Sequence, residues 1–349
     1  MGNAYLIRAE NSGKYMAAED ERRWTGDLVA AVRRRRVTGL VVNLLPSGIW
    51  LLVFFVVPLL VMFYYSFGER GAFGEVLLGL GNLGLQQYAL FFVPEGATLP
   101  EAIWYTVAYV LERLIPLDVQ LAAGEPTPYV QLTVKSIEFG VVATLVSLAV
   151  GYPAAYYIGH VAPERYRNLL LVLVVLPFWA SYLVRVYAVK ILLSSNSILT
   201  NALGVLPFVE SGQSLMNSGF AVMTGMTYIW IPFMILPVYA SIEQVDFTLQ
   251  EAAMDLGADR YQAFTRVILP LSAPGVVAGS ILVFIPSAGA FVIPELLGGT
   301  DSRLIGNFIA NQFGAAGNWP LGAAASFVLM GIMLGAIAIY QRYGEGDLA

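Results

Sequence analysis

The chain has 349 residues, and only 12% of them are charged, whereas ordinary soluble domains carry about 25% charged residues. Together with a hydrophobic fraction of 58%, this composition predicts an integral membrane protein. A net charge of −5 excludes a strongly basic nucleic-acid-binding protein, the lack of cysteine excludes disulfides and thiolate chemistry, and a single histidine, His160, disfavours a histidine-built metal site.

Six apolar stretches are long enough to cross a membrane, because a spanning helix needs roughly 20 mainly apolar residues. We therefore expect an all-α polytopic membrane protein with about six transmembrane helices. The stretches lie near residues 41–66, 137–159, 168–193, 218–241, 273–296 and 319–341. A polar segment precedes the first stretch and no small-residue cleavage site follows it, so we expect a retained span rather than a signal peptide.

The distribution of Lys and Arg in the short loops predicts the orientation in the membrane. Four arginines, at 33–36, directly precede the first apolar stretch, which places the N-terminus in the cytoplasm. With six spans, the C-terminus and Arg342 return to the same side. The expected organisation is a cytoplasmic segment at 1–38, a first transmembrane helix at 39–67, an extracytoplasmic loop at 68–135, a five-helix core at 136–341 and a cytoplasmic tail at 342–349.

The extracytoplasmic loop contains one apolar patch, AIWYTVAYVLERLI at 102–115. This patch is too short to span a membrane and includes Glu112 and Arg113, so we expect an interfacial or packed helix outside the membrane. A seventh span is the alternative. The sequence indicates no function for residues 96–130.

A polar run at residues 243–272, which we call the elbow, interrupts the apolar sequence. Thr248 and Glu251 have the spacing of a capping box, which predicts a short helix. Gly257 lies where a left-handed C-terminal cap is needed, because glycine reaches positive φ without a Cβ clash. Asp259 has the position of a cap for a second helix. We therefore expect two short helices that meet at a glycine corner.

The residue pattern leaves two interpretations of the elbow open. One is an amphipathic connector that lies on the membrane surface, and the other is a rigid docking element for a cytosolic partner. Pro270 is expected to end the second helix, since proline has no backbone N–H to continue it.

Charges inside the spans are candidate functional residues, because burying one in hydrocarbon costs at least about 2.5 kcal/mol. Arg185 lies in the outer half of the third span, and Glu295 lies at the outer end of the fifth. Arg185 can be structural if it pairs with a carboxylate or with backbone carbonyls, and Glu295 can be a cap or an ion-pair partner. The functional interpretation of Glu295 is a carboxylate at the outer mouth of the pathway, where it attracts an ammonium group.

Aromatic residues near these two charges can present π faces to a passing cation, each contact contributing on the order of 0.5 to 2 kcal/mol. Trp and Tyr also gather at membrane interfaces without any such role. The aromatic candidates for the translocation path are Trp179, Tyr182, Tyr187 and Phe291.

Small residues and prolines indicate how the spans pack. Two G-x-x-x-G pairs, at 275–279 and 331–335, predict close approach of neighbouring helices. Pro232 and Pro237 lie inside the fourth span, where each removes a backbone donor and is expected to kink the helix. Packing geometry and a gating hinge both remain as explanations of the prolines.

The elbow resembles the signature of permease subunits of ATP-binding-cassette importers: E-A-A, three residues, Gly, nine residues, an aliphatic residue, one residue and Leu-Pro. Val267 is the one departure, since the family usually has Ile at that position. The resemblance implies that the elbow is a coupling helix that sits in a cleft of a separate ATPase subunit. The coupling residues that it implies are Glu251, Ala252, Ala253, Gly257, Leu269 and Pro270.

The chain lacks the Walker-type phosphate loop, G-x-x-x-x-G-K-[ST], in which backbone amides and a lysine hold the phosphates. None of its lysines, Lys14, Lys135 and Lys190, stands in that pattern. We therefore expect a transport subunit without enzyme activity or a cofactor of its own, with ATP and Mg²⁺ bound by a partner ATPase.

Several stretches look like the permeases of spermidine and putrescine importers, and they come in that family's order. The resemblance implies a type I importer permease that works by alternating access, with two cytosolic ATPases, a second similar permease and an extracytoplasmic solute-binding protein, in the lipids of a bacterial or archaeal cell membrane. The stretches are GYPAAYYIG at 151–159, LPFWASYLVRVYA at 176–188, PFMILPVYASIE at 232–243, FVIPELLGG at 291–299 and NWPLGAAASF at 318–327.

Three alternatives differ in function. The first is an importer permease for another small solute, such as an amino-acid derivative, an anion or a metal complex. The second, a secondary transporter or channel that needs no ATPase, is disfavoured because no carboxylate lies near the middle of a span. The third, a membrane enzyme, is disfavoured by the lack of cysteine, by the lone histidine and by the scarcity of intramembrane carboxylates.

Overall fold

The structure is a computed structural model that describes residues 45–344, apart from 73, 80, 115–120, 122–123, 196 and 204–213. The predicted cytoplasmic segment at 1–38 and most of the predicted tail at 342–349 lie outside the described residues. The chain divides into two units, Met1–Tyr64 and Tyr65–Ala349, and each is described by itself.

The described part of the first unit is one helix that can cross a membrane. It runs from Leu45 to Tyr65, a length of 21 residues, and includes the π turn η1 (Leu52–Val56) and the helix α2 (Val57–Tyr65). Pro58 stands two residues after the end of the π turn, and such turns satisfy the backbone groups that a proline frees in a membrane helix. The first predicted span is therefore helical over most of its length.

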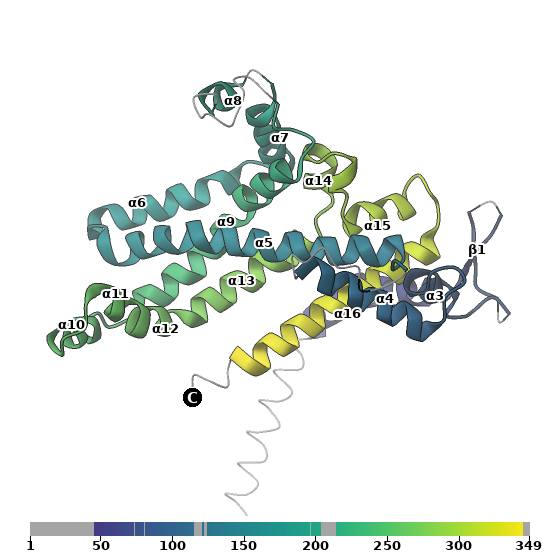
Figure 1. Ribbon diagram of the computed structural model, residues 1–349, viewed down its shortest axis with the longest axis horizontal. Helices are drawn as coiled ribbons and strands as arrows, with labels where there is room; N and C mark the ends of the chain where they lie inside the picture. Colours follow the sequence, from purple (N-terminus) through teal and green to yellow (C-terminus); the bar gives the residue numbers. More distant parts are fainter. Residues whose placement is uncertain are drawn as a thin grey trace, which may run out of the picture. The chain divides into compact units, whose positions relative to one another are not determined.

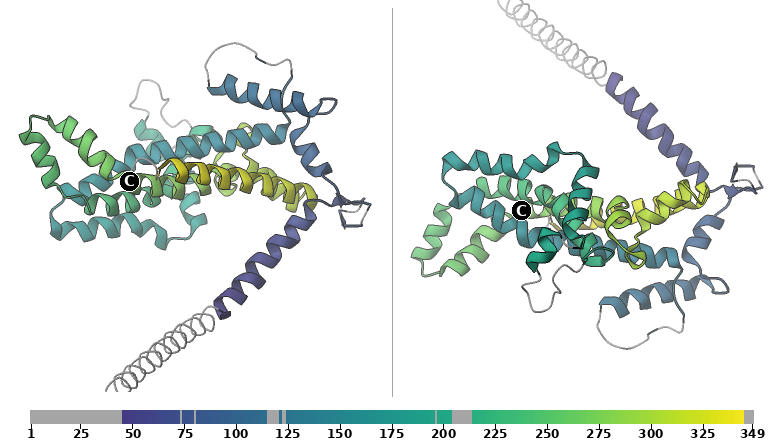
Figure 2. Two further views of the ribbon diagram at one scale, coloured as in Figure 1. Left: turned by 90° about the horizontal axis from the view of Figure 1, so that it is seen from below. Right: turned by 90° about the horizontal axis from the view of Figure 1, so that it is seen from above.

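The second unit is built on three long helices that pack against one another: α5 (Pro128–Tyr156), α9 (Gly219–Glu243) and α13 (Ala273–Ala288). They lie side by side in Figure 1 and in the two views of Figure 2. The start of α5 is capped by the Thr127 hydroxyl, which accepts a hydrogen bond from the Val130 amide. Ser218 caps α9 in the same way.

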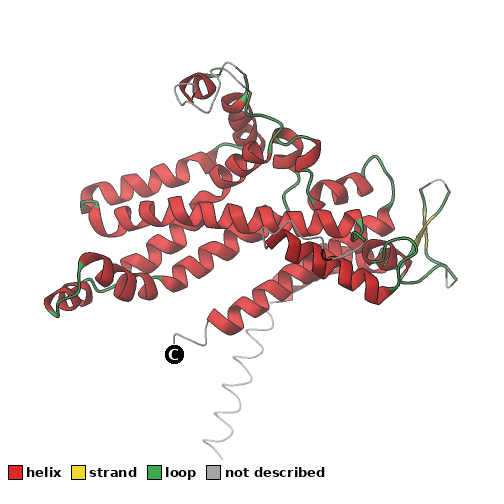
Figure 3. Ribbon diagram, in the orientation of Figure 1, coloured by secondary structure: helices red, strands yellow, loops and turns green. Residues whose placement is uncertain are grey.

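Besides one more long helix, α16, the other elements of the second unit are shorter, and Figure 3 shows that almost all of them are helical. Their bounds are β1 Glu69–Arg70, β2 Val76–Leu77, α3 Gln86–Phe92, α4 Leu99–Leu114, η2 Tyr157–Val161, α6 Glu164–Val175, η3 Leu176–Trp179, α7 Tyr182–Leu193, α8 Ile198–Leu203, α14 Val292–Leu297, η5 Thr300–Ser302, α15 Ile305–Phe313 and α16 Trp319–Gly344, besides four in the elbow. The two strands pair antiparallel, with Glu69 opposite Leu77 and Arg70 opposite Val76.

Two apolar clusters hold the three long helices together. One cluster joins α5, α7, α9 and α14, with Met226 and Ile293 fully buried in it. The other joins α5, α9 and α13 nearer the elbow, with Tyr152, Met234 and Val283 at its centre. Since both clusters contain residues of α5 and α9, these two helices form the shared packing surface of the bundle.

The described residues contain five helices that are long and apolar enough to cross a membrane, or six if a bent pair is counted as one span. The bent pair is Arg260–Leu271 with Ala273–Ala288, which meet at an angle of 63°. This number agrees with the prediction of about six spans, and the all-α fold class is confirmed.

The prediction of one unbroken third span at 168–193 is wrong. The chain leaves the helix α6 at Val175, forms the 3₁₀ turn η3 and starts again as α7 at Tyr182. Pro177 stands in the 3₁₀ turn, and the Ser181 hydroxyl accepts a hydrogen bond from the Val184 amide, so a new helix is capped there. The apolar composition hides this break because it says nothing about backbone hydrogen bonds.

The fifth predicted span at 273–296 is also broken. Its helix α13 ends at Ala288, and the short helix α14 begins only at Val292. Gly306 of α15 lies against the break, where an added Cβ would come within 2.6 Å of the Ala290 carbonyl oxygen and 2.8 Å of the Gly289 oxygen. The break therefore places two carbonyl groups directly against a neighbouring helix.

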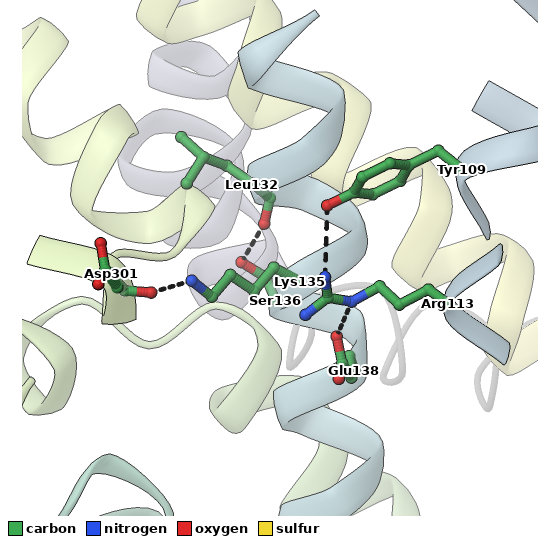
Figure 4. A network of polar contacts seen from close by, with 7 residues as sticks. All are labelled: Tyr109, Arg113, Leu132, Lys135, Ser136, Glu138 and Asp301. Atoms are coloured by element: carbon green, nitrogen blue, oxygen red, sulfur yellow. Dashed lines mark hydrogen bonds and ion pairs between the residues drawn. The ribbon is translucent and has the colours of Figure 1, made fainter. Parts of the chain in front are cut away.

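The apolar patch at 102–115 forms a helix, as predicted. The helix α4 has 16 residues, fewer than a membrane span needs, and it exposes Ile103, Trp104 and Val107 on one face. Figure 4 shows Arg113 of α4 paired with Glu138 of α5.

With η2 included, the α5 helix runs for 34 residues, so its predicted start at 137 is about nine residues too late.

The two G-x-x-x-G pairs differ in their surroundings. An added Cβ at Gly275 would lie 2.5 Å from the Pro237 carbonyl oxygen, and one at Gly279 would lie 2.9 Å from the Met234 sulfur. These glycines let α13 approach α9 closely. The helix α9 itself is continuous through both of its prolines, Pro232 and Pro237. At Gly331 and Gly335, by contrast, no atom of the described residues lies within 4 Å of an added Cβ, so the close approach predicted for that pair is not seen there.

Gly275→Ala is expected to destabilise the bundle by about 1–3 kcal/mol, because the added methyl group meets backbone that cannot move aside. The measurement is the thermal unfolding temperature of the purified chain in detergent, followed by intrinsic fluorescence. The control is Gly331→Ala, which makes the same exchange in the second glycine pair and should leave the unfolding temperature unchanged. Equal unfolding temperatures for the two variants would contradict the close packing of α13 on α9.

Candidate functional site

The elbow consists of two helical arms joined at Gly257. One arm is α10 (Thr248–Asp255), and the other consists of α11 (Arg260–Ala263), the π turn η4 (Phe264–Ile268) and α12 (Leu269–Leu271). Gly257 has a φ of +95°, which L side chains rarely adopt. The predicted pair of helices around a glycine corner is therefore formed, and it projects at one end of the bundle (Figure 1).

The second arm is capped as predicted. Asp259 Oδ1 accepts a hydrogen bond of 2.7 Å from the Gln262 amide, and Gln262 Oε1 accepts one of 3.4 Å from the Asp259 amide. The second arm continues to Leu271, one residue beyond Pro270, where its predicted end was placed. The π turn η4 precedes Pro270, as the π turn η1 precedes Pro58.

The capping box predicted for Thr248 and Glu251 is not formed. The helix α10 begins at Thr248 itself, and Asp246 Oδ1 accepts a 3.0 Å hydrogen bond from the Thr248 amide. Hydrogen bonds from the Thr248 hydroxyl and amide lower the pKa of Asp246 below its ordinary value. A carboxylate is a stronger acceptor than a hydroxyl at the positive end of a helix, so Asp246 displaces Thr248 from this role.

Large apolar side chains are exposed at the tip of the elbow. Leu256 is 90% exposed, Tyr261 is 76% exposed and Leu249 is 49% exposed. The signature residues Glu251 and Ala252 are exposed on the same arm as Leu249. A cluster of exposed apolar groups with a rigid backbone is typical of a protein-binding surface rather than of a solvated loop.

The elbow is attached to α5 and η2 by aromatic rings. The Phe264 ring lies edge-on to the rings of Tyr152 and Tyr156, with centroid distances of 5.8 and 5.6 Å. Phe247 stacks on His160 at 3.7 Å. His160, for which the sequence indicated no function, thus belongs to the joint between the elbow and the bundle.

Arg185 is enclosed by aromatic side chains near the start of α7. Its guanidinium lies 4.6 Å from the centre of the Phe178 ring, and Nη1 donates a 3.5 Å hydrogen bond to the Ile229 carbonyl. Among the described residues no carboxylate pairs with it, and its buried Nε has no hydrogen-bond partner. Tyr182, another predicted pathway residue, stacks on Trp230 at 6.0 Å in the same region. A carbonyl and a ring, rather than a carboxylate, are therefore the partners that the structure gives to Arg185.

Trp179 and Tyr187 lie on more exposed positions. The Trp179 side chain is 83% exposed after η3, and the Tyr187 ring lies 5.8 Å from the Lys190 ammonium group. Their predicted role in the pathway rests on the sequence alone.

Phe291 and Glu295 line one cavity of about 560 Å³ at the end of the bundle opposite the elbow. The buried Asn307 amide donates hydrogen bonds to the Phe291 carbonyl, at 2.8 Å, and to Glu295 Oε2, at 3.0 Å. We call this space, which lies between α14 and α15, the α14–α15 cavity. The structure thus brings together two of the six predicted pathway residues with an asparagine that the prediction missed.

One wall of the cavity is held by α5. The Lys135 ammonium group donates a hydrogen bond to the Asp301 carbonyl (Figure 4). The Ser136 hydroxyl accepts a 2.8 Å hydrogen bond from the Ile305 amide. The same hydroxyl donates to the Leu132 carbonyl. These bonds fix the connection between α14 and α15 against the start of α5.

Comparison with protein families places the chain among transport proteins. A family model, that of the binding-protein-dependent transport system inner membrane component, matches residues 147–343, more than half of the chain. The chain belongs to this family. The matched region includes the elbow, α7, the α14–α15 cavity and most of α16.

Curated relatives of this permease share substantial identity with it. Over 214 residues it is 42% identical to the spermidine/putrescine transport system permease protein PotB of Haemophilus influenzae, which covers 61% of this chain and 74% of that protein. The PotB protein of Escherichia coli is equally similar and is covered to 78%. A probable molybdenum transporter permease of Haloferax volcanii is 30% identical over 248 residues, covering 67% of this chain and 86% of that protein.

Two solved structures share the fold. One is the crystal structure of a bacterial transporter involved in the import of the acidic polysaccharide alginate, with a TM-score of 0.59 and 19% identity over 88% of this chain and 96% of that one. The other is the alginate transporter in complex with an alginate pentasaccharide-bound periplasmic protein, with a TM-score of 0.57, 18% identity and coverage of 88% and 93%. At this identity the likeness shows the fold alone, which is that of an importer permease.

Asp259→Ala is expected to loosen the second arm of the elbow, because loss of an N-cap costs about 1 kcal/mol. Hydrogen exchange measured by mass spectrometry should become about fivefold faster at the amides of 260–263. Asp255→Ala removes an exposed carboxylate from the first arm and serves as the control, with no change expected at these amides. Unchanged exchange in Asp259→Ala would show that the cap does not order this arm.

Proposed function

We propose that this permease imports polyamines such as spermidine and putrescine, driven by ATP that a separate subunit hydrolyses. The observation that carries the proposal is the 42% identity to spermidine/putrescine permeases, over an alignment that covers three quarters of those proteins. The cavity carboxylate Glu295 supports a cationic cargo, because a carboxylate attracts ammonium groups and repels anions.

The proposed assembly contains a second, similar permease, two cytosolic ATPases and an extracytoplasmic solute-binding protein. The elbow lies in the cytoplasm, and the α14–α15 cavity faces the binding protein. The coupling residues are those of the signature, and the exposed side chains of Leu256 and Tyr261 supply the apolar part of the contact with the ATPase. This chain performs no covalent chemistry and holds no cofactor, since ATP and Mg²⁺ bind to the partner.

Alternating access follows from the way in which the elbow is attached. When the ATPases close around ATP, the two elbows of the permease pair are drawn together. The rings of Phe247 and Phe264 press on η2 and α5, so the displacement passes into the three-helix bundle and opens the path outward. After ATP is hydrolysed, the two elbows return to their separated positions, and the path opens inward. The host is a bacterium or an archaeon, in whose cell membrane both termini of the chain face the cytoplasm.

A second candidate cargo is an oxyanion. The similarity to the molybdenum permease favours it, as does Arg303, which lines the same cavity as Glu295. The uptake of radiolabelled spermidine by membrane vesicles of the native host separates the two candidates. Uptake that depends on ATP and on this chain, and that putrescine but not molybdate inhibits, supports polyamine import; inhibition by molybdate alone would contradict it.

The partner subunits can be identified by purification of the tagged chain from its native host in mild detergent, followed by mass spectrometry. We expect a Walker-motif ATPase and a second permease to co-purify. A chain that is recovered alone, or only with itself, would remove the support for coupling through the elbow.

Gly257→Val is expected to abolish co-purification of the ATPase while membrane insertion stays normal. Within the described part of the chain, no atom lies within 4 Å of an added Cβ at Gly257, so the effect comes from its positive φ, which a β-branched residue resists. Gly317→Val is the matched control, since Gly317 has a φ of +60° and equal space but lies before α16. Normal recovery of the ATPase with Gly257→Val would defeat the docking role of the elbow.

A further inference from the structure

The α14–α15 cavity combines a carboxylate with aromatic walls. Glu295, Phe291, Phe308 and Asn311 are among its lining residues, and its volume is about 560 Å³. Phe291 is 49% exposed, so its ring is available to a bound molecule. A carboxylate beside aromatic faces is the arrangement that recognises organic ammonium groups, through a charged hydrogen bond and cation–π contacts.

The Glu295 carboxylate is oriented by Asn307, whose side chain is buried and fully used. Its Nδ2 group donates to both the Phe291 carbonyl and Glu295 Oε2, while its Oδ1 accepts a 3.2 Å hydrogen bond from the Leu304 amide. Glu295 Oε1 accepts no hydrogen bond from the described residues, which leaves one carboxylate oxygen for a ligand. Asn307 thus fixes the direction of the carboxylate without neutralising it.

Among the residues that the structure describes, one acid, Glu295, and one base, Arg303, line the α14–α15 cavity itself, and a second acid lies next to it. A neighbouring cavity of about 490 Å³ shares Glu295, Thr300 and Arg303 with it and adds the carboxylate of Asp301. Arg303 is the one base that lines either cavity in the described part of the chain, against two acids. The Lys135 ammonium group is bound to the Asp301 carbonyl from α5 and lines neither cavity.

We propose that the α14–α15 cavity is a receiving site for a terminal ammonium group of the cargo, with Glu295 as the binding residue and Asn307 as its positioning residue. This inference rests on the proposed polyamine cargo. The ammonium group donates a hydrogen bond to Glu295 Oε1 and lies against the rings of Phe291 and Phe308. Arg303 opposes this binding, because its charge has the same sign as that of the cargo. The bonds of Lys135 and Ser136 keep the cavity wall in place while the cargo enters (Figure 4).

The site can be tested by cysteine labelling, since the chain contains no cysteine of its own. Asn311→Cys places one thiol in the cavity, and its rate of reaction with a small neutral methanethiosulfonate reagent is measured by the mass of this chain. The whole importer is used, in membrane vesicles of the native host, with and without spermidine. We expect spermidine at about ten times its dissociation constant to slow the reaction about tenfold, because only about a tenth of the sites are then free. The control thiol is Ile198→Cys, a position that is 87% exposed on α8, and spermidine should not protect it.

Two charge variants decide which residue holds the cargo. In the Asn311→Cys background, Glu295→Gln should remove the protection by spermidine, whereas Arg303→Gln should keep or strengthen it. Protection that persists with Glu295→Gln would overturn the assignment of Glu295. Protection that is lost with Arg303→Gln but kept with Glu295→Gln would show that spermidine binding depends on Arg303 rather than on Glu295 and would overturn the inference.

A double-substitution experiment separates the positioning role of Asn307 from a merely structural one. Asn307→Ala alone should reduce the protection by spermidine, because the carboxylate is no longer oriented. In the Glu295→Gln background, the same exchange should have no further effect. A loss that adds to that of Glu295→Gln would show that Asn307 acts by some other route and would overturn its assignment.

Uptake by the same vesicles distinguishes failure of the site from failure of the proposed function. Spermidine uptake without protection of Asn311→Cys would overturn the receiving site and leave the proposed cargo intact. Absence of both uptake and protection, for spermidine and for putrescine, would overturn the proposed cargo and this inference with it.

Discussion

Hydrocarbon offers no hydrogen-bond partner to a polypeptide backbone, so every interruption of a membrane helix has to be satisfied by the protein itself. The break between α13 and α14 obeys this constraint through α15. Asn307 donates to the Phe291 carbonyl, and Gly306 brings the α15 backbone against the carbonyls of Gly289 and Ala290. The same asparagine orients Glu295. One side chain therefore both satisfies a backbone carbonyl at the break and positions the carboxylate that lines the cavity. The break in the third predicted span is resolved by a serine cap and a 3₁₀ turn.

The elbow combines a fixed backbone with exposed apolar side chains. Its exposed apolar residues are useful for docking only if the backbone that carries them keeps a fixed direction. That direction is fixed by the Asp259 cap, the Gly257 corner and the ring contacts of Phe247 and Phe264. Tyr152 adds a 2.8 Å hydrogen bond to Ser272, at the point where the second arm bends into α13. A displacement of the elbow is therefore transmitted to the bundle through a continuous series of packed side chains, rather than absorbed by a flexible loop.

Local rules predicted some parts of this structure well. Gly257 and Asp259 were found from the sequence because their roles depend on neighbours within three residues. Thr248 was misassigned because Asp246, a stronger acceptor two residues earlier, was not weighed against it. The Glu295–Asn307 contact was not visible, since nothing in the sequence shows that two residues twelve apart face each other across a break. Hydropathy likewise measures only how apolar the residues are and carries no information on backbone conformation. It therefore predicted one span where α6 and α7 are separate helices, and one span where α13 and α14 are separate helices.

The length of α5 places the start of this helix beyond the hydrocarbon layer. A helix of 34 residues is about 51 Å long, whereas the hydrocarbon layer is about 30 Å thick. Some of α5 therefore stands in water, and Leu132, which lines the α14–α15 cavity, lies within two turns of its start. Charges in water are screened beyond about 8 Å at physiological salt, so the carboxylate of Glu295 acts only on what has already arrived. The proposed receiving site therefore acts over a short range and is sensitive to salt.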